Sequence, residues 1–232
     1  SWVRGISFDS DVVPPESTAF VGRSEQLEQL ETLFVGGARL LTVLGPGGMG
    51  KTRLVQRYCH QHRDAYVHQG GGVWFCDLAE TRTSTAMCAV LARTMGIPLP
   101  VQKDQQAAVD VLGQAIHGRG NTLVVLDNFE QVVDEGSPVL SRWLQLASHA
   151  RFCVTSREKL RLPEEVVLEL PPLDTSSDTK GAGECEAVHL FLQRAQTTSH
   201  GFSAQDKAAV LEIVRELDGM PLAIELAAAR CS

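Results

Sequence analysis

The sequence is poor in the features that mark nucleic-acid-binding and membrane proteins. It carries 21 Lys and Arg residues against 28 Asp and Glu, a formal net charge of -7, so a broad basic surface for nucleic acid is not expected. No apolar run approaches the roughly 20 residues of a membrane-spanning helix. Residues 1–10 lack the basic and apolar regions of an export signal. We therefore expect a cytoplasmic protein whose segment here binds neither membranes nor nucleic acid directly.

The sequence also lacks the cysteine patterns of metal and redox sites. Its six cysteines are scattered, with no C-x-x-C pair and no histidine at metal-ligand spacing. This argues against a zinc site or a redox dithiol. Cys76 and Cys153 lie inside apolar runs, where a thiol behaves as a small hydrophobic group. We expect these two to be buried structural thiols.

What is present is an alternation of strand and helix patterns in a chain of globular composition. The chain has 232 residues, 44% of them hydrophobic and 21% charged. Leu123 to Leu126 form an unbroken apolar run, typical of a strand covered on both faces. Strands are predicted at 39–44, 72–79, 121–127, 151–155 and 166–170, and helices at 26–34, 51–61, 84–95, 105–117 and 138–148. This order predicts an α/β fold with a doubly wound, five-stranded parallel sheet, whose ligands bind at the carboxyl ends of the strands.

The pattern changes after residue 170. Residues 174–183 read as a linker, and helices are predicted at 187–196, 204–217 and 221–230. We predict three parts: a leader at 1–19 that lies on the domain or is a linker, a nucleotide-binding domain at 20–173, and a small helical subdomain at 184–232. Because the last helix runs into the chain end without a cap, we expect the subdomain to be truncated there.

A phosphate-binding loop is the most specific motif. It matches G-x-x-x-x-G-K-[ST], follows a strand and opens a helix. Backbone N–H groups of such a loop, with the helix N-terminus, attract a phosphate chain. The lysine would reach the β- and γ-phosphates and the threonine hydroxyl would bind Mg²⁺. The alternative is a glycine-rich turn without a ligand. The loop residues are Gly45, Pro46, Gly47, Gly48, Met49, Gly50, Lys51 and Thr52, and we add the next residue, Arg53, to the nucleotide-binding set.

Asp127 ends the apolar strand and is the predicted Walker B acid, a second Mg²⁺ ligand beside Thr52. The alternative role is a strand-end Asp in an Asx-turn. One complete strand separates the P-loop strand from this one in sequence, which favours the additional-strand type of P-loop NTPase sheet. The sequence has no Asn-Lys-x-Asp guanine motif. We therefore expect ATP or ADP, with Mg²⁺, as the ligand.

The chain resembles the STAND ATPases (signal transduction ATPases with numerous domains), near the NB-ARC type and most like large bacterial LuxR-like regulators. The resemblance runs from about residue 20 to residue 230. Besides the P-loop, it rests on six segments, which are FVGRSE (20–25), GVWFCDL (72–78), LVVLDNFE (123–130), VTSRE (154–158), LPPL (170–173) and GMPLA (219–223).

The resemblance implies roles for residues outside the P-loop. The backbone of the element that contains Val21, Gly22 and Arg23 would lie against adenine, and Pro221 near the base or sugar. Arg23 would help to close the pocket, or would simply bind a carboxylate. Arg157 lies just past a strand beside the P-loop strand, where a guanidinium can contact a γ-phosphate. Its alternative role is a surface ion pair.

One departure concerns catalysis. Many ATPases of this broad class place a second acid directly after the Walker B Asp to activate water, and here that position is Asn128. An amide can orient a water but cannot accept its proton. Glu130 is the best remaining candidate base, with Asp77 and Glu80 as weaker ones, although a solvated loop carboxylate is the ordinary alternative. With Lys51, Asp127 and Arg157 it completes the candidate catalytic set. We expect slow hydrolysis.

Three functions fit these residues. The first is a molecular switch in which ATP with Mg²⁺, or ADP, sits between the α/β domain and the helical subdomain. The second is a binding and oligomerisation module that holds ADP with little turnover. A small-molecule kinase ranks last, because nothing resembles an acceptor-binding lid. The expected partners are the nucleotide, flanking domains of the same chain, namely a winged helix and sensor or effector domains, and other copies through ATP-dependent self-association.

Overall fold

The structure is a computed structural model that describes residues 12–16, 19–99, 105–176, 185–198 and 207–230. Strands and helices are interspersed as far as residue 169, with two described helices between β2 and β3 and none between β4 and β5, and the later described elements are helices. The elements in chain order are α1 (Ser24–Val35), β1 (Leu40–Leu44), α2 (Lys51–His68), β2 (Gly72–Asp77), α3 (Ser84–Met95), α4 (Gln105–His117), β3 (Thr122–Asp127), η1 (Phe129–Gln131), α5 (Val133–Leu146), β4 (Arg151–Ser156), β5 (Glu165–Glu169), α6 (Glu186–Thr198), α7 (Lys207–Glu216) and α8 (Pro221–Ala228).

Two predicted helices differ from the structure by five residues or more at one end, and the other described helix boundaries differ by two residues or fewer. Helix α2 continues seven residues beyond the predicted end, because Tyr66 returns the helix to the buried face after a polar stretch. Helix α5 begins at Val133 instead of 138, and Pro138 lies inside it. The prediction placed this proline at the helix start, where proline is favoured. In the structure the first turn of α5 packs Gly136 closely against the ring of Phe129. The predicted residues 204–206 of α7 lie outside the described residues.

The five strands form one sheet in the order β2-β3-β4-β1-β5, with every pairing parallel. Strand β4 lies between β1, which precedes the P-loop, and β3, which ends in Asp127. The prediction of a doubly wound parallel sheet of the additional-strand type is therefore confirmed. In register, Asp77 at the end of β2 stands level with Asp127, and Leu44 at the end of β1 stands level with Ser156.

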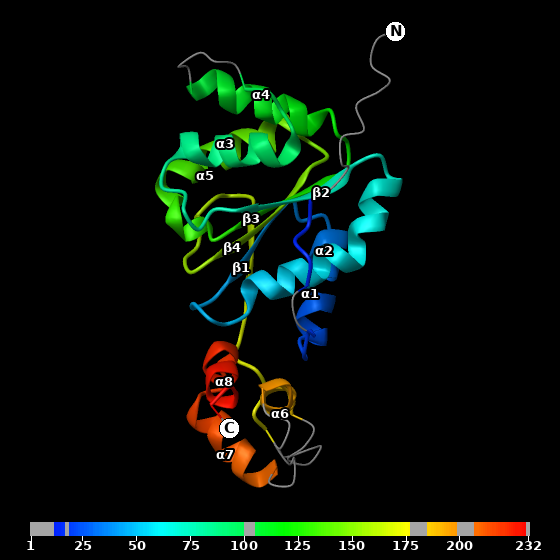
Figure 1. Cartoon of the computed structure of the whole chain (residues 1–232). Coiled ribbons are helices and arrows are strands. Elements are labelled where there is room, and N and C mark those ends of the chain that lie inside the picture. Colours follow the sequence, from blue (N-terminus) through cyan, green and yellow to red (C-terminus); the bar gives the residue numbers. More distant parts are fainter. Residues whose placement is uncertain (1–11, 17–18, 100–104, 177–184, 199–206, 231–232) are drawn as a thin grey trace.

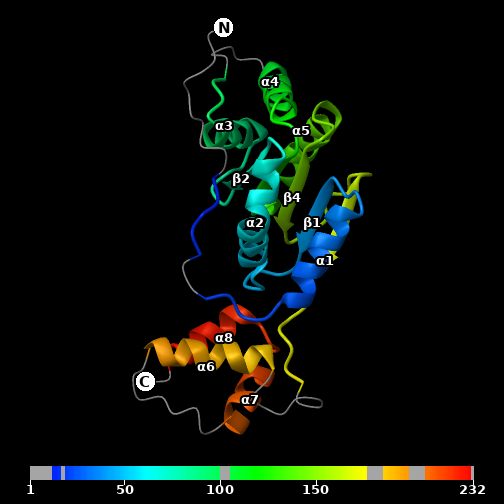
Figure 2. The same ribbon diagram turned by 90° about the vertical axis from the view of Figure 1, so that its right-hand side faces the viewer.

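Helices cover both faces of the sheet (Figures 1 and 2). On one face α3, α4 and α5 bury a cluster that includes Leu126, Trp143 and Phe152. On the other face α1 and α2 bury a second cluster that includes Phe34 and Tyr58. Burial of apolar surface on both faces is the main stabilising term for such a sheet.

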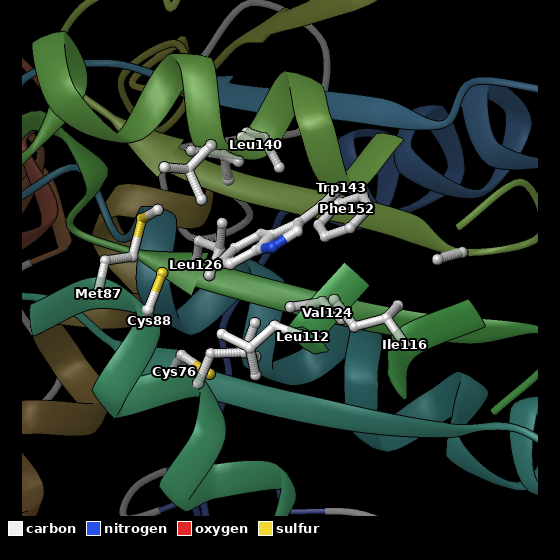
Figure 3. Packing of buried hydrophobic residues seen from close by; sticks show 14 of the residues in the cluster. Cys76, Met87, Cys88, Leu112, Ile116, Val124, Leu126, Leu140, Trp143 and Phe152 are labelled. Atoms are coloured by element: carbon white, nitrogen blue, oxygen red, sulfur yellow. The ribbon is translucent and has the colours of Figure 1, made fainter. Parts of the chain in front are cut away.

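The first of these clusters is centred on Trp143 (Figure 3). Its ring stacks on Phe152, with centroids 6.4 Å apart, and its indole Nε1 donates to the carbonyl of Val109 at 3.0 Å. The buried polar atom of the tryptophan is thus paired, as burial requires. Figure 3 also shows Cys76 and Cys88 in this layer.

The described cysteines are free and buried. Cys76 is 1% exposed and Cys153 is 0% exposed, so the prediction of buried thiols is confirmed for both. Burial raises the pKa of the Cys76 thiol to about 12. Cys231 lies outside the described residues. Among the helices that the structure describes, none is long and apolar enough to cross a membrane.

Part of the leader lies against the sheet. Val12 forms a parallel bridge with Trp74 of the edge strand β2. Its amide donates to the carbonyl of Val73 and its carbonyl accepts from the amide of Phe75, both at 2.8 Å. These bonds satisfy backbone groups that an edge strand otherwise leaves open.

The C-terminal helices α6, α7 and α8 share a third, smaller cluster that includes Phe191, Val214 and Ile224. Figures 1 and 2 show them beyond one end of the sheet. The segment that leads to them from β5 is tied back where the amide of Leu173 donates to the carbonyl of Gly219 at 2.9 Å. Gly219 has φ +62°, and a Cβ there would lie 2.3 Å from that segment's backbone, so only glycine fits.

Candidate functional site

The P-loop joins β1 to α2 at the carboxyl edge of the sheet. Gly48 and Gly50 have φ of +80° and +85°, which favours glycine at both positions. A Cβ on Gly47 would lie 3.2 Å from Nη2 of Arg157, and one on Gly48 would lie 2.9 Å from the Cβ of Leu222. The loop backbone is therefore approached closely from two sides, which is the form of a cradle for a phosphate chain.

Lys51 lies along the inside of this loop. It is 8% exposed, and its Nζ donates to the carbonyl oxygens of Gly45 at 2.7 Å and Pro46 at 2.9 Å. Burial lowers its pKa, and the carboxylates of Glu130 and Asp127 act in the opposite direction. The ammonium group is thus held at the loop, in the place where the motif predicts a phosphate contact.

The two predicted Mg²⁺ ligands lie together. The Thr52 hydroxyl lies 2.9 Å from Oδ1 and 3.0 Å from Oδ2 of Asp127. Thr155 donates to Oδ1 of the same carboxylate at 2.5 Å. Asp127 is 2% exposed, and burial raises its pKa, with Thr155 and Thr52 acting against the shift. A buried carboxylate beside a hydroxyl offers the oxygen ligands that Mg²⁺ prefers, so these residues fit the ion.

Asn128 occupies the position of the missing second acid. It has φ +61°, a left-handed conformation that asparagine tolerates. Its amide N–H donates to Oγ1 of Thr155 at 3.0 Å. Its side-chain Nδ2 donates to Asp77 at 2.9 Å and to Asp127 at 3.2 Å. The side chain therefore bridges the carboxylates at the ends of β2 and β3, and it has no proton-accepting role there.

Glu130 and Arg157 form an ion pair at the mouth of the site. Nε of Arg157 lies 2.9 Å from Oε1 of Glu130, whose side chain is 10% exposed, whereas that of Arg157 is 62% exposed. The second carboxylate oxygen of Glu130 is buried without a hydrogen-bond partner among the described residues. The ion pair anticipated as an alternative for Arg157 is present, next to Gly47 of the P-loop.

Arg23 ties the segment before α1 to the site. It is 5% exposed, and its guanidinium donates to the carbonyl oxygens of Pro171 at 2.6 Å and Met49 at 3.3 Å. The carboxylate of Glu186 accepts from the Arg23 backbone amide at 2.8 Å. Burial lowers the pKa of Arg23, and the charge of Glu186 opposes this. The guanidinium bonds are thus to backbone carbonyl groups and the carboxylate of Glu186 is held by the backbone amide, and the closing of the pocket by Arg23 stays a prediction.

Helix α8 forms the far wall. Pro221 is its first residue, as predicted. The amide of Leu222 donates to the carbonyl of Gly48 at 3.1 Å, and Arg53 pairs with Glu225 at 2.9 Å. Leu222 and Glu225 were not predicted as site residues. Leu222 lies in the GMPLA segment, and the position of Glu225 one helical turn after Pro221 could have indicated it.

Two cavities lie between these elements. The larger, of about 260 Å³, is lined by the P-loop from Gly47 to Arg53 together with Asn128, Glu130, Arg157, Pro221, Leu222 and Glu225. A smaller one, of about 40 Å³, is lined by Phe20, Val21, Arg23, Met49, Gly50, Arg53, Leu173, Leu190 and Pro221. The structure thus brings most of the predicted site residues together. Gly22 lies behind them, where a Cβ would meet the side chain of Glu186.

A family model described as an AAA domain matches residues 35–159. This span begins before β1 and ends after β4, so it contains the P-loop, Asp127 and Arg157. It covers more than half of the chain.

Several relatives are longer than this chain. A protein of Mycobacterium tuberculosis named only as uncharacterized is 33% identical over 215 residues, covering 92% of this chain and 51% of that protein. A candidate HTH-type transcriptional regulator of the same organism is 35% identical over 196 residues, covering 83% and 20%. A disease resistance protein of Solanum bulbocastanum is 23% identical over 208 residues, covering 87% and 21%. The chain thus spans about half the length of the first relative and about a fifth of the other two.

Solved structures with a similar fold come from several organisms. Cdc6p of Pyrobaculum aerophilum has a TM-score of 0.66 at 18% identity, with coverage of 91% of this chain and 62% of that one. The ORC1 protein of Aeropyrum pernix, solved in complex with DNA, has a TM-score of 0.65 at 16% identity, with coverage of 90% and 59%. A STAND protein with a tetratricopeptide repeat sensor from Pyrococcus horikoshii has a TM-score of 0.54 at 15% identity, with coverage of 89% and 29%. At these identities the likeness concerns the fold.

Proposed function

The chain belongs to the AAA domain family of P-loop ATPases, and from this premise we propose that it is a nucleotide-dependent switch with slow, Mg²⁺-dependent ATP hydrolysis. The observation that supports the switch is the hydrogen bond from Leu222 to the P-loop carbonyl of Gly48. Because one wall of the larger cavity is α8, a ligand in the P-loop would also contact the C-terminal helices. Differential contact with two arrangements is what a ligand needs in order to shift between them.

The nucleotide-holding residues have separate roles in this proposal. The P-loop amides and Lys51 bind the phosphate chain, and Thr52 and Asp127 hold Mg²⁺. When bound, Mg²⁺ would neutralise charge on the phosphate oxygens. Phosphate affinity thus comes from one loop and a few placed cations, which is compatible with a net charge of -7.

Arg157 and Glu130 supply a way to distinguish ATP from ADP. A γ-phosphate near Gly47 would compete with Glu130 for the exposed guanidinium of Arg157. Release of Arg157 would leave the buried carboxylate of Glu130 free to accept a proton from water, while Asn128 can only orient that water. Glu130 would therefore act as a base only after the γ-phosphate has replaced it as the partner of Arg157. Because the usual second acid is also absent, we expect slow hydrolysis.

We also propose a role for this chain within a longer protein. We propose that the chain is a STAND-type module of a transcription-regulating or signalling protein, with division into a domain at 20–173 and a helical subdomain at 184–232. The length of the relatives and the name of the mycobacterial regulator support this. Winged-helix and sensor or effector domains, ATP-dependent self-association and a cytoplasmic location remain predictions. So does the absence of direct nucleic-acid binding by this segment, since a structure of similar fold was solved with DNA.

Calorimetric titration with ATP and ADP, with and without Mg²⁺, tests the site. Lys51→Ala is expected to lose nucleotide binding while the circular dichroism spectrum is retained. The matched control is Lys159→Ala, because Lys159 is half-exposed and pairs loosely with Glu169 at 3.7 Å. Unchanged affinity in Lys51→Ala would reject the site. Turnover of tens per second in the unmodified protein would contradict the slow switch.

A second function, an ADP-holding module with little turnover, is favoured by Asn128 at the position of the second acid. The nucleotide extracted from purified protein separates the two proposals. Tightly retained ADP with no hydrolysis over hours supports the holding module. Exchange of ADP for ATP, followed by slow hydrolysis, supports the switch.

A further inference from the structure

A cavity of about 200 Å³ lies at the opposite edge of the sheet from the P-loop, where β3 and β4 begin. It opens between α1 and α2, which cover the same face of the sheet (Figure 2). Neither the P-loop nor any other residue of the nucleotide site lines it. The lining residues are Glu31, Phe34, Val35, Tyr58, His62, Ala65, Tyr66, Gln69, Asn121 and Arg151.

One side of this cavity is a wall of flat rings. Tyr58 stacks on His62 with centroids 4.2 Å apart, and Phe34 lies 5.6 Å from Tyr58. Val35 stands at the rim and is 79% exposed, the highest exposure among the exposed large hydrophobic residues of the described chain. Such a wall favours a planar apolar group.

The inner end of the cavity is polar. Tyr66 is 4% exposed, and its hydroxyl has no partner at hydrogen-bond distance and angle among the described residues. Burial raises the pKa of Tyr66, and the neighbouring Arg151 guanidinium and Tyr58 hydroxyl oppose this shift. The Arg151 guanidinium lies 6.0 Å from the centre of the Tyr66 ring, and none of the ion pairs found among the described residues involves it. The amides of Gln69 and Asn121 bond to each other. A buried hydroxyl next to a guanidinium that forms none of the ion pairs found among the described residues favours an anionic acceptor.

We propose that this cavity binds a small aromatic carboxylate. The ring would lie against Phe34, Tyr58 and His62, and the carboxylate would accept from Arg151 and from the hydroxyl of Tyr66. The size agrees with one substituted ring, since a cavity of about 150 Å³ takes up benzene. Glu31 at the rim disfavours a polyanion such as a phosphate chain. The site is separate from the nucleotide site and does not depend on the function proposed for it.

The test uses the whole chain, saturated with ADP and Mg²⁺, and benzoate as the probe. Binding is followed by calorimetry and by amide chemical shifts of α1, α2 and the start of β4. Benzyl alcohol, which has the ring without the charge, and acetate, which has the charge without the ring, are expected to bind at least about tenfold more weakly, because each loses one half of the site.

Two substitutions locate the carboxylate. Arg151→Gln is expected to weaken benzoate binding about tenfold, and Tyr66→Phe by a smaller factor, because a charge-assisted hydrogen bond is stronger than a neutral one. Arg151→Lys keeps the positive charge and should bind benzoate more tightly than Arg151→Gln. Such a recovery would show that the weaker binding of Arg151→Gln is not caused by misfolding. The control is Arg82→Gln, since Arg82 lies at the other edge and donates only to the nearby backbone carbonyls of Ala79 and Thr81.

Three results would overturn the proposal. They are no benzoate binding at millimolar concentration, equal binding of benzyl alcohol, and unchanged benzoate affinity in Arg151→Gln. ADP affinity is measured in the same samples. Loss of benzoate binding with unchanged ADP affinity in Arg151→Gln separates this site from the nucleotide site.

Discussion

The parallel sheet and the C-terminal helices differ in how each is stabilised. The sheet buries an apolar cluster on both faces, with contributions from its strands and from helices α1 to α5. The C-terminal helices share one smaller cluster, completed by Leu173 and Val21 from outside the helices. Polar contacts join them to the P-loop, to α2 and to the segment before α1, and these include Leu222 to Gly48, Arg53 to Glu225 and Glu186 to Arg23. We infer that the sheet with α1 to α5 is a rigid half that positions phosphate groups. The helices α6 to α8 form a less stable half that can respond to them.

The largest expected effect comes from deleting one buried ring in each half. Phe152 is 0% exposed in the sheet core and Phe191 is 1% exposed in the C-terminal helices. Phe152→Ala should lower the free energy of unfolding of the whole chain by about 3–5 kcal/mol, because it leaves a cavity in the core. Phe191→Ala should instead open α6, α7 and α8 locally. Hydrogen exchange measures both. If Phe191→Ala also lowers protection across β1 and β3, the two halves unfold as one unit and the comparison fails.

A smaller effect is expected where the halves touch at the P-loop. Gly48→Ala forces φ +80° on a residue with a side chain and brings its Cβ to 2.9 Å from Leu222. Gly70→Ala is the matched control, since Gly70 has φ +78° and nothing within 4 Å of an added Cβ. Denaturant unfolding should show a loss of about 1–2 kcal/mol for both variants from backbone strain. Only Gly48→Ala should also weaken ADP binding, and Leu222→Gly, which removes the Cβ that the new side chain would meet, should partly rescue it. Equal ADP affinity in both variants would show that α8 does not constrain the loop.

The pH dependence of Mg²⁺-nucleotide binding tests the rigid half alone. Burial raises the pKa of Asp127, so protonation begins above the usual range of an aspartate. Below the raised pKa, Mg²⁺-dependent ATP affinity should fall by about tenfold per pH unit, as measured by calorimetry. The nucleotide-free protein should show the opposite trend, because an acid with a raised folded-state pKa stabilises the fold at low pH and that contribution is lost as pH rises through it.

Asp127→Asn is the control for this titration. It should lose Mg²⁺-dependent affinity at every pH, and the free protein should be at least as stable as the unmodified one in thermal unfolding. A variant that is less stable at neutral pH would mean that the charged carboxylate stabilises the fold despite its burial.

The smallest expected effect is that of the ion pair between the halves. Arg53 and Glu225 have side chains 34% and 22% exposed, so a double-mutant cycle with Arg53→Gln and Glu225→Gln should give about 0.2–1 kcal/mol. Arg142 and Asp110 form a comparable pair, both 41% exposed, within the sheet half. High salt should weaken both pairs. Only loss of the pair Arg53–Glu225 should raise hydrogen exchange in α8. If exchange in α8 does not change, this ion pair does not help to hold the C-terminal helices against the P-loop domain.

Much of the fold could be predicted because its signals are local. The apolar run from Leu123 to Leu126 identified a buried strand, and the glycines before Lys51 identified a phosphate-binding loop, in which the structure gives Gly48 and Gly50 positive φ. Predicted helix boundaries were wrong where tertiary packing outweighed a local sequence preference. Pro138 was placed at a helix start by its propensity, whereas in the structure it lies inside a helix that packs against the buried Phe129.

The nucleotide site could be predicted only in part, because several of its contacts join residues that are far apart in the sequence. Thr52 and Asp127 were recognised from motifs, but the donation of Thr155 to Asp127 joins residues on different strands. Arg157 was expected near the phosphate, and its pairing with Glu130 came from the structure. No sequence signal indicated the cavity of Tyr66 and Arg151, because its walls come from two helices and two strand starts.

The sequence by itself therefore determined the phosphate loop, the strand that carries the Walker B acid, and the presence of five strands in an α/β chain. These follow from backbone sterics, glycine placement and apolar periodicity over a few residues. Only the tertiary structure decided which side chains face each other across the site, how α8 meets Gly48, and where the aromatic cavity lies. Such contacts depend on the packing of elements far apart in sequence, which no local pattern records.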